Sequence, residues 1–184
     1  MSTGVTIESL NAGEAGEAVA ALASVLKDCV EGGASVSFMA PLPVERATAF
    51  WRDVAVGVAA GDRILLVARS VPDRKILGTV QVVSAQPENQ PHRADIAKML
   101  VSPSARRRGI GAMLMREAER AAWQAGKTVL VLDTVTGGDA ERLYERLGWA
   151  RSGIIPKYAL WPHGGYCDTT VFFKERPESP APVR

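Results

Sequence analysis

Apolar positions in the N-terminal part of the chain follow two different periods, one typical of helices and one typical of strands. Residues 15–30 carry Val19, Leu22, Leu26 and Val30 at helical spacing and are followed by a pair of glycines, so the pattern predicts a helix there. A second helix is expected over residues 43–60, because its first residue is a proline, which suits a first helical turn. Strand-like runs separated by turn-forming residues occupy residues 3–10, 63–70, 75–84 and 92–101.

The pattern changes after residue 101. Residues 109–125 are expected to form a helix with one apolar stripe, made of Ile110, Leu114, Ala118, Ala121 and Ala125. Residues 128–134 are almost all β-branched or leucine, which predicts a strand buried on both faces. A helix over residues 139–147 should be capped by Asp139 and end at Gly148. Closing strands are expected at residues 154–160 and 167–174.

The predicted order of elements is β-α-α-β-β-β-α-β-α-β-β. The strand, helix and strand from residue 95 to residue 134 imply a parallel pair joined by a crossover helix, whereas the strands before them suit antiparallel hairpins. This order indicates an α/β domain with a mixed sheet. We expect a single domain over residues 1–176 and a flexible, proline-containing tail over residues 177–184.

Composition narrows the class of protein without identifying a function. The 184 residues are 47% hydrophobic and 23% charged, with a formal net charge of +2, so we expect a soluble protein whose main partner is neither a nucleic acid nor a membrane. The two cysteines, Cys29 and Cys167, form no CxxC pattern, which argues against a disulfide framework or a metal site and favours free thiols in the cytoplasm. We expect a monomer or a homodimer.

The strongest chemical signal is the loop that begins Arg106-Arg107-Arg108 and opens a helix at Gly109. The first turn of a helix presents unpaired N–H groups and a partial positive charge, and glycines let a phosphate approach the backbone. A Walker loop is excluded because Gly-Lys-Ser/Thr is absent, and a dinucleotide fingerprint would need a glycine where Leu114 stands. A solvated basic loop and a nucleic-acid contact remain alternatives on these residues alone.

Two segments resemble the central motifs of the GNAT superfamily of acetyltransferases: residues 98–111, KMLVSPSARRRGIG, and residues 140–149, AERLYERLGW. The similarity extends over residues 5–174. It implies the GNAT (acyl-CoA N-acyltransferase) fold, a mixed central sheet with a splayed parallel strand pair and flanking helices, and acetyl-CoA as co-substrate with no metal. By this resemblance the strand residues Met99, Leu100 and Val101 bind the pantetheine arm, and the diphosphate is held by Arg106, Arg107, Arg108, Gly109, Ile110, Gly111 and Ala112.

A narrower similarity is to the tabtoxin-resistance type of acetyltransferase. It is carried by residues 32–36 (GGASV), 38–40 (FMA) and 132–134 (LDT), together with Pro156-x-Tyr158-Ala159. It implies a small-molecule acceptor, an amino-acid-like metabolite or toxin, held by the loop at residues 32–40, residues 156–158 and Tyr166. Many members of the superfamily place an asparagine after the strand that ends near residue 134, but here residues 137–139 are Gly-Gly-Asp, so we assign that role to no residue.

No serine or cysteine lies in a nucleophile pattern such as G-x-S-x-G, so direct attack by an amine or a hydroxyl on the thioester is the simpler mechanism. Asp133, at the carboxyl end of its strand, is a candidate base, with a turn cap as the alternative. Asp95 is a second candidate base, expected on the same face as Met99 and Val101, with a plain ion pair as the alternative. Tyr144 falls on an apolar helical stripe and reads as a core residue, but the resemblance implies that it is the general acid toward the sulfur.

Two other functions remain open at this point. One is an acetyltransferase of the same superfamily that acts on polyamines or on protein amino termini. The other is a protein that binds acetyl-CoA without turnover, as a sensor; the presence of both Asp133 and Tyr144 argues against it.

Overall fold

The computed structural model describes residues 4–178. The predicted tail therefore lies outside the described residues from residue 179 onward, as does the first residue of the predicted N-terminal strand. The helices are α1 (Ala12–Glu17), α2 (Val19–Glu31), α3 (Val44–Ala59), a short 3₁₀ helix (Pro103–Ala105), α4 (Ile110–Gln124) and α5 (Asp139–Arg146). The strands are β1 (Val5–Leu10), β2 (Arg63–Ser70), β3 (Ile76–Ser84), β4 (Arg93–Val101), β5 (Val129–Val135), β6 (Ala150–Leu160) and β7 (Tyr166–Glu175).

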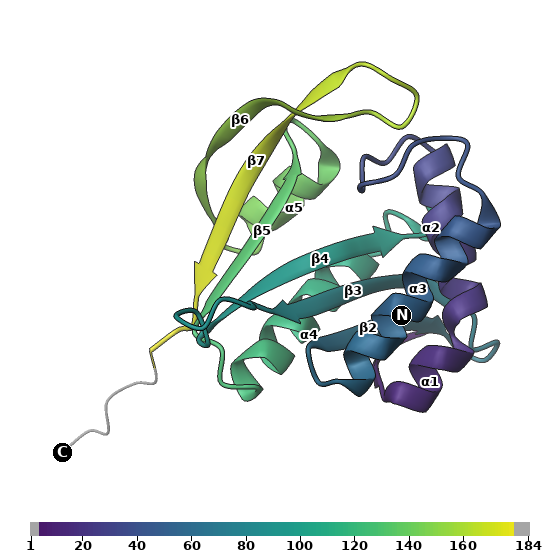
Figure 1. Ribbon diagram of the computed structural model, residues 1–184, viewed down its shortest axis with the longest axis horizontal. Helices are drawn as coiled ribbons and strands as arrows, with labels where there is room; N and C mark the ends of the chain where they lie inside the picture. Colours follow the sequence, from purple (N-terminus) through teal and green to yellow (C-terminus); the bar gives the residue numbers. More distant parts are fainter. Residues whose placement is uncertain (1–3, 179–184) are drawn as a thin grey trace.

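All seven strands form one sheet in the order β1-β2-β3-β4-β5-β7-β6 (Figure 1). The pair β4–β5 is parallel, and the other neighbours are antiparallel. Helix α4 connects the two parallel strands, as a crossover must. The predicted mixed sheet with one parallel pair and flanking helices is therefore confirmed.

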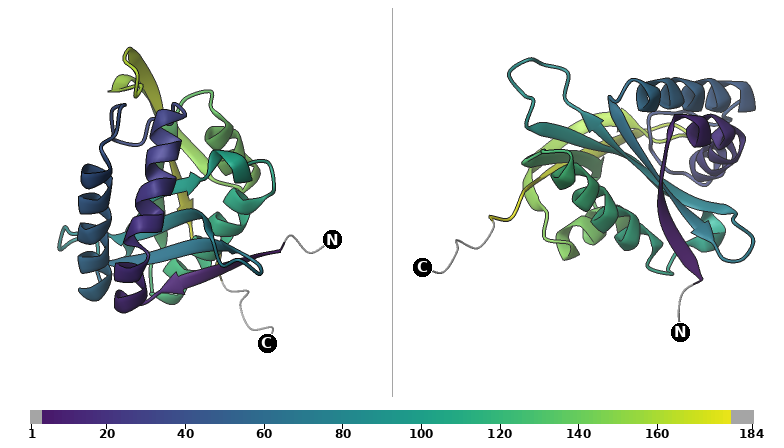
Figure 2. Two further views of the ribbon diagram at one scale, coloured as in Figure 1. Left: turned by 90° about the vertical axis from the view of Figure 1, so that its right-hand side faces the viewer. Right: turned by 90° about the horizontal axis from the view of Figure 1, so that it is seen from below.

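The helices cover the two faces of the sheet separately (Figure 2). Helices α1, α2 and α3 lie over one face and enclose a first core that includes Leu22, Leu26 and Trp51. Helix α4 lies over the other face and packs Leu114 and Met115 into a second core, which α5 extends at one end. Alternate residues of β2 divide between these cores, because successive side chains of a strand point to opposite faces.

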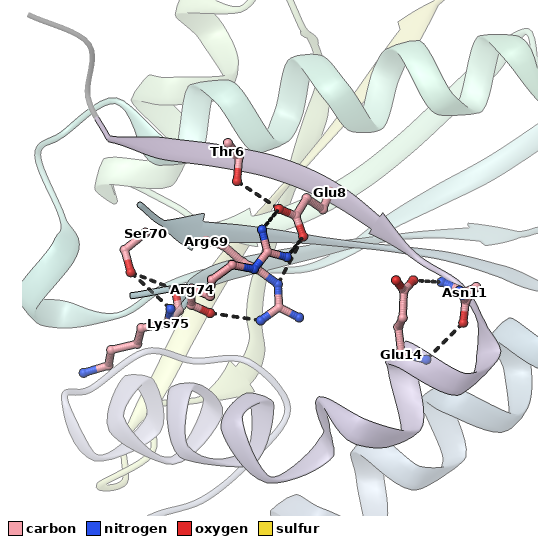
Figure 3. A network of polar contacts seen from close by, with 8 residues as sticks. All are labelled: Thr6, Glu8, Asn11, Glu14, Arg69, Ser70, Arg74 and Lys75. Atoms are coloured by element: carbon pink, nitrogen blue, oxygen red, sulfur yellow. Dashed lines mark hydrogen bonds and ion pairs between the residues drawn. The ribbon is translucent and has the colours of Figure 1, made fainter. Parts of the chain in front are cut away.

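Polar contacts fix the N-terminal segment (Figure 3). Asn11 and Glu14 form a reciprocal capping box that begins α1, and a separate helix α2 follows at Val19. The single helix predicted from residue 15 is therefore wrong at its start, because the apolar repeat begins later than the cap. Glu8 on β1 accepts two hydrogen bonds from Arg74 at 2.8 Å and pairs with Arg69 on β2 at 3.2 Å, which ties the edge strand to its neighbour.

Two predicted strands differ from the structure in ways that bear on function. In β5 only Leu130 and Leu132 are buried, whereas Asp133 is exposed, so the expected burial of both faces is wrong. The other face stays open because β4 and β5 separate, as described below. Strand β6 begins at Ala150 rather than at residue 154, because its ladder with β7 starts at the pair Ala150 and Phe173.

Candidate active site

The two parallel strands are paired over only a short stretch. Arg93, Ala94 and Asp95 of β4 are in register with residues 129–131 of β5, and no further pair of these strands is formed among the described residues. Beyond these pairs β5 leans away from β4 (Figure 1). A cavity of about 1240 Å³ opens there, lined by both strands, by the beginning of α4, by α5 and by the loop between α2 and α3. The carboxyl ends of parallel strands are where open α/β sheets bind their ligands.

A bulge in β4 changes which side chains share a face. Thr79 of β3 pairs with Leu100, and Gln81 pairs with Ala97, so two residues of β4 oppose one of β3. The bulge contains Lys98, whose φ is 50°. Leu100 consequently packs into the first core, whereas Met99 and Val101 pack against the second. The expectation that Asp95 shares a face with those two residues is therefore wrong, because a strict alternation does not survive the inserted residue.

The basic loop meets the cavity at the first turn of α4. Gly109 is the N-cap residue, with φ 77°, and no side chain caps the helix, so the first N–H groups of α4 keep no intrahelical or capping partner. A Cβ on Gly109 would meet no atom within 4 Å, so space lies open beside it. A Cβ on Gly111 would lie 3.1 Å from a methyl group of Leu143 and 3.6 Å from the sulfur of Met99. Glycine thus allows α4 to pack closely on α5 and β4.

Arginine side chains are distributed around this helix end. Arg106 donates from Nε to the carbonyl of Val101 at 3.2 Å, and Arg107 pairs with Asp139 of α5 at 3.2 Å. These groups, with the uncapped N–H groups and the open space at Gly109, suit a diphosphate. Of the ten residues predicted to bind the co-substrate, all but Arg108 line the cavity. The nine that do are Met99, Leu100, Val101, Arg106, Arg107, Gly109, Ile110, Gly111 and Ala112.

Asp139 is not the cap that was predicted for α5. Gly138 occupies the N-cap position, and Asp139 is the first helical residue. Its carboxylate pairs with Arg142 at 2.5 Å and with Arg107. The hydrogen bond from Arg142 and the charge of Arg107 hold the pKa of Asp139 below its usual range. The carboxylate of Asp139 therefore pairs with two guanidinium groups and links the basic loop to α5.

The three predicted acid–base residues all line the cavity. Asp133 is exposed near the end of β5. Asp95 is already paired with Arg93, 2.6 Å away. Tyr144 is only 5% exposed, and its ring packs against Trp149 and Phe172. Burial, and in second place the charge of Asp133, raises the pKa of Tyr144. The phenol is thus held neutral, and it lies within electrostatic reach of Asp133.

A buried carboxylate, Glu141, positions the helix that carries Tyr144. It accepts hydrogen bonds from the N–H of Gly137 and, at 2.9 Å, from Thr170, and it pairs with Arg151 at 2.9 Å. Burial alone would raise the pKa of Glu141, but these hydrogen bonds and the positive charge outweigh it, so the pKa is lowered. Sequence reasoning missed this residue. The available signal was an acidic residue three positions before Tyr144, on the helix face turned to the core.

The opposite end of the cavity is built from two remote segments. Ser35 donates to the carbonyl of Leu160 at 2.9 Å, and the N–H of Ala40 donates to the carbonyl of Pro162 at 2.9 Å. The loop between α2 and α3 thus meets the β6–β7 hairpin (Figure 1). Of residues 156–158 only Tyr158 lines the cavity, and it does so from within β6 rather than from a turn, so the expected place of Pro156 and Lys157 in the site is wrong. Tyr166 lies outside the lining, so its expected place in the site is wrong.

A lysine that sequence reasoning missed also lines the cavity. Lys98, in the bulge of β4, donates to Ser37 at 3.0 Å. Within residues 4–178 no group of three or more His, Cys, Asp or Glu side chains is arranged to hold a metal ion. In the same residues no helix is both long and apolar enough to cross a membrane.

Comparison with known proteins identifies one family. A family model described as the acetyltransferase (GNAT) family matches residues 36–149. Among solved structures, yncA, a candidate acetyltransferase from Salmonella typhimurium solved with its cofactor acetyl-CoA, is 18% identical, with a TM-score of 0.76 and 98% of each chain covered. A candidate phosphinothricin N-acetyltransferase is 17% identical, with a TM-score of 0.75, over 95% of this chain and 99% of the other. A ribosomal-protein-alanine N-acetyltransferase from Brucella melitensis is 19% identical, with a TM-score of 0.75, over 93% and 99%.

Proposed function

Because the chain belongs to the acetyltransferase (GNAT) family and is an acetyltransferase, we propose that it transfers the acetyl group of acetyl-CoA to an amine of a small, amino-acid-like metabolite or toxin. Transfer to a hydroxyl group of such a molecule is the second form of the same proposal. The observation that carries it is the cavity between β4 and β5, which has an uncapped helix N-terminus at one end and Asp133 and Tyr144 in its walls.

The residues around the start of α4 suit the diphosphate of acetyl-CoA. The N–H groups of Ile110, Gly111 and Ala112 are the free donors of the first turn, and Arg106 and Arg107 add positive charge beside them. The backbone of residues 99–101 lies on the edge of β4 that β5 leaves unpaired, where an extended pantetheine arm could add as a strand would. Bound there, acetyl-CoA supplies an activated thioester.

Asp133 is the proposed base. An aliphatic ammonium group has a pKa of about 10, so at neutral pH it must lose a proton before it can attack a carbonyl carbon. Asp133 is exposed to the cavity, and the structure gives its carboxylate no ion pair with another described residue. Asp95 is a weaker candidate because Arg93 already neutralises it. We therefore assign proton removal to Asp133 and a supporting electrostatic role to Asp95.

Tyr144 is the proposed donor toward the departing sulfur. Its raised pKa keeps the hydroxyl protonated at neutral pH, which a donor requires. A thiol has a pKa of about 8.5, below that of this phenol, so stabilisation of the thiolate by a hydrogen bond is favoured over complete proton transfer. The packing of the ring against Trp149 and Phe172 holds the hydroxyl in one direction.

A small acceptor is favoured over a protein amino terminus. The contacts of Ser35 with Leu160 and of Ala40 with Pro162 close one side of the cavity, where an extended peptide would need an open groove. The similarity of several loops to the tabtoxin-resistance type supports an amino-acid-like acceptor. Transfer to a polyamine or to a protein amino terminus is the alternative acceptor class.

Two measurements test the proposal. Calorimetry should detect binding of acetyl-CoA to the pure folded protein, and acetyl-CoA-dependent thiol release should appear with at least one member of a panel of amino acids and amino antibiotics. Binding without thiol release from any amine would favour a sensor. The absence of any affinity for acetyl-CoA would refute the proposal as a whole.

A further inference from the structure

Lys98 occupies an unusual backbone position at the mouth of the gap between β4 and β5. Its φ of 50° lies in the left-handed region, which lysine rarely adopts, and the bulge inserts it between the register pairs of β3 and β4. Without the bulge the side chain would follow the regular alternation of the strand. The bulge instead aims a cation toward the loop that carries Ser37, beside the cavity.

The side chain of Lys98 is half-buried, and its ammonium group has only weak partners. It donates to Ser37 at 3.0 Å and lies 5.8 Å from the centre of the Phe50 ring. No carboxylate of the described residues forms an ion pair with it, although ten ion pairs occur elsewhere in residues 4–178. A neutral hydroxyl and an aromatic ring do not offset the free-energy cost of removing a charged ammonium group from water.

The electrostatics agree with this geometry. Burial, and in addition the positive charge of Arg63, lowers the pKa of Lys98, while the charge of Asp133 opposes them. Asp133 therefore acts on Lys98 from beyond ion-pair distance, across the gap between the two strands. An anionic ligand beside the ammonium group would stabilise its positive charge, which no neighbouring carboxylate of the described residues does by an ion pair.

We propose that Lys98 binds the carboxylate of a free amino acid acceptor, while Asp133 receives the amine of the same molecule. The inference rests on the proposed function and narrows it. Lys98 and Asp133, a cation and an anion on neighbouring strands in the walls of the same cavity, match a zwitterion, whereas a polyamine or an internal peptide segment offers nothing to Lys98. Lys98 is thus a specificity-determining residue for the acceptor and takes no part in proton transfer.

The test compares each free L-amino acid of a panel with its carboxamide, since the pair differs in the charge that Lys98 would recognise. For the accepted side chain, kcat/KM from thiol release should favour the free acid by about 10- to 100-fold, the range for one charge-assisted hydrogen bond. Lys98→Met should remove this preference through KM for the acid, with little change for the carboxamide. Lys98→Arg should restore part of it. Equal losses for acid and amide, or no preference in the wild type, would overturn the inference.

Lys157 provides a matched control. It is also a lysine with positive φ, 53°, at an irregularity of a strand, but it lies outside the cavity lining and its ammonium faces the Tyr166 ring at 6.0 Å. Lys157→Met should keep the preference for the acid. Calorimetry with the protein saturated with CoA measures the same preference without turnover. A binding preference without thiol release would contradict the proposed catalysis and support Lys98, whereas turnover without any preference would contradict Lys98 alone.

Discussion

Replacing Tyr144 by phenylalanine removes one oxygen atom and separates catalysis from stability. Within the described residues the hydroxyl makes no hydrogen bond to the protein, while the ring is buried against Trp149 and Phe172. Tyr144→Phe keeps the ring and breaks no protein hydrogen bond, so the free energy of unfolding should change by less than about 1 kcal/mol. If the hydroxyl stabilises the departing thiolate, kcat should fall by about 10²–10⁴-fold.

The two effects differ enough to be distinguished. At about 1.36 kcal/mol for each factor of ten, the expected loss in transition-state stabilisation is about 2.7–5.4 kcal/mol, several times the change expected in stability. The assay is thiol release at saturating acetyl-CoA and acceptor, combined with calorimetric affinity for acetyl-CoA, which should stay within about threefold. Urea denaturation measures the stability of the same samples.

Tyr166→Phe is the matched control. Tyr166 is 68% exposed and lies outside the cavity lining, so the same atomic change there should leave kcat unaltered. An unchanged kcat for Tyr144→Phe would refute the role of the hydroxyl. A loss of activity that parallels a loss of stability would refute it too, because the residue would then act only through packing.

Three further predictions follow from the site. Asp133→Asn should lower kcat/KM by about 10²–10⁴-fold and flatten the acidic limb of its pH profile, and an unshifted profile would exclude Asp133 as the base. Gly109→Ala should lower the free energy of unfolding in urea by about 1–2 kcal/mol, because alanine is strained at the φ of 77°, and an unchanged midpoint would contradict that backbone geometry. Because burial raises the pKa of Tyr144 in the folded protein, Tyr144 ionises in the unfolded protein at a lower pH than in the folded protein. Above about pH 10 the free energy of unfolding should therefore fall as the pH rises, with this residue contributing up to about 1.4 kcal/mol per pH unit. Tyr144→Phe should lose less stability than the wild type over that range, and parallel pH–stability curves would argue against the raised pKa.

Local signals predicted most of the fold. The range predicted for β2, residues 63–70, matches the strand, and the helix predicted over residues 109–125 differs from α4 by one residue at each end. These boundaries are set by glycines and by apolar periods that act within one turn or one strand. The start of α1 at Ala12 could also have been predicted from the sequence, because Asn11 and Glu14 have the spacing of a capping box.

The bulge of β4 could not be predicted from the alternation of polar and apolar residues along the strand. It is a change of register between β3 and β4, two strands on which α2 packs from one face and α4 from the other, and such long-range packing has no signal in the local sequence. Asp95 therefore does not share a face with Met99 and Val101, although those two residues do lie on one face, as expected. On α4, Ala122 is buried where Ala121 and Ala125 were expected, since the buried positions Ile110, Leu114, Ala118 and Ala122 keep a spacing of four residues to the end of the helix.

The candidate site was recognised through resemblance rather than periodicity. Tyr144 reads as a core residue on its helical stripe, and the structure does bury its ring, yet the residue also lines the cavity. Lys98 and Glu141 escaped prediction because a charged residue in a strand or helix reads as solvent-facing until its neighbours are known. The meeting of β5, α5 and the basic loop is a property of topology, which no single segment encodes.

The two ends of the cavity differ in the number of separate chain segments that form them. Under the proposed function the residues that hold the pantetheine arm and the diphosphate lie within one unbroken stretch, residues 99–112, so a single segment of the chain supplies that end of the cavity. The proposed acceptor end is built where two remote stretches meet: Ser35 contacts Leu160, and Glu31 contacts His163, across separations of 125 and 132 residues. Both hydrogen-bond acceptors are main-chain carbonyl oxygens, so only Ser35 and His163 contribute side chains to these contacts. We expect replacement of Ser35 or His163 to remove a contact between the two stretches, whereas Leu160 and Glu31 can change while their carbonyl oxygens stay in place, so the acceptor end can diversify on one side at a time.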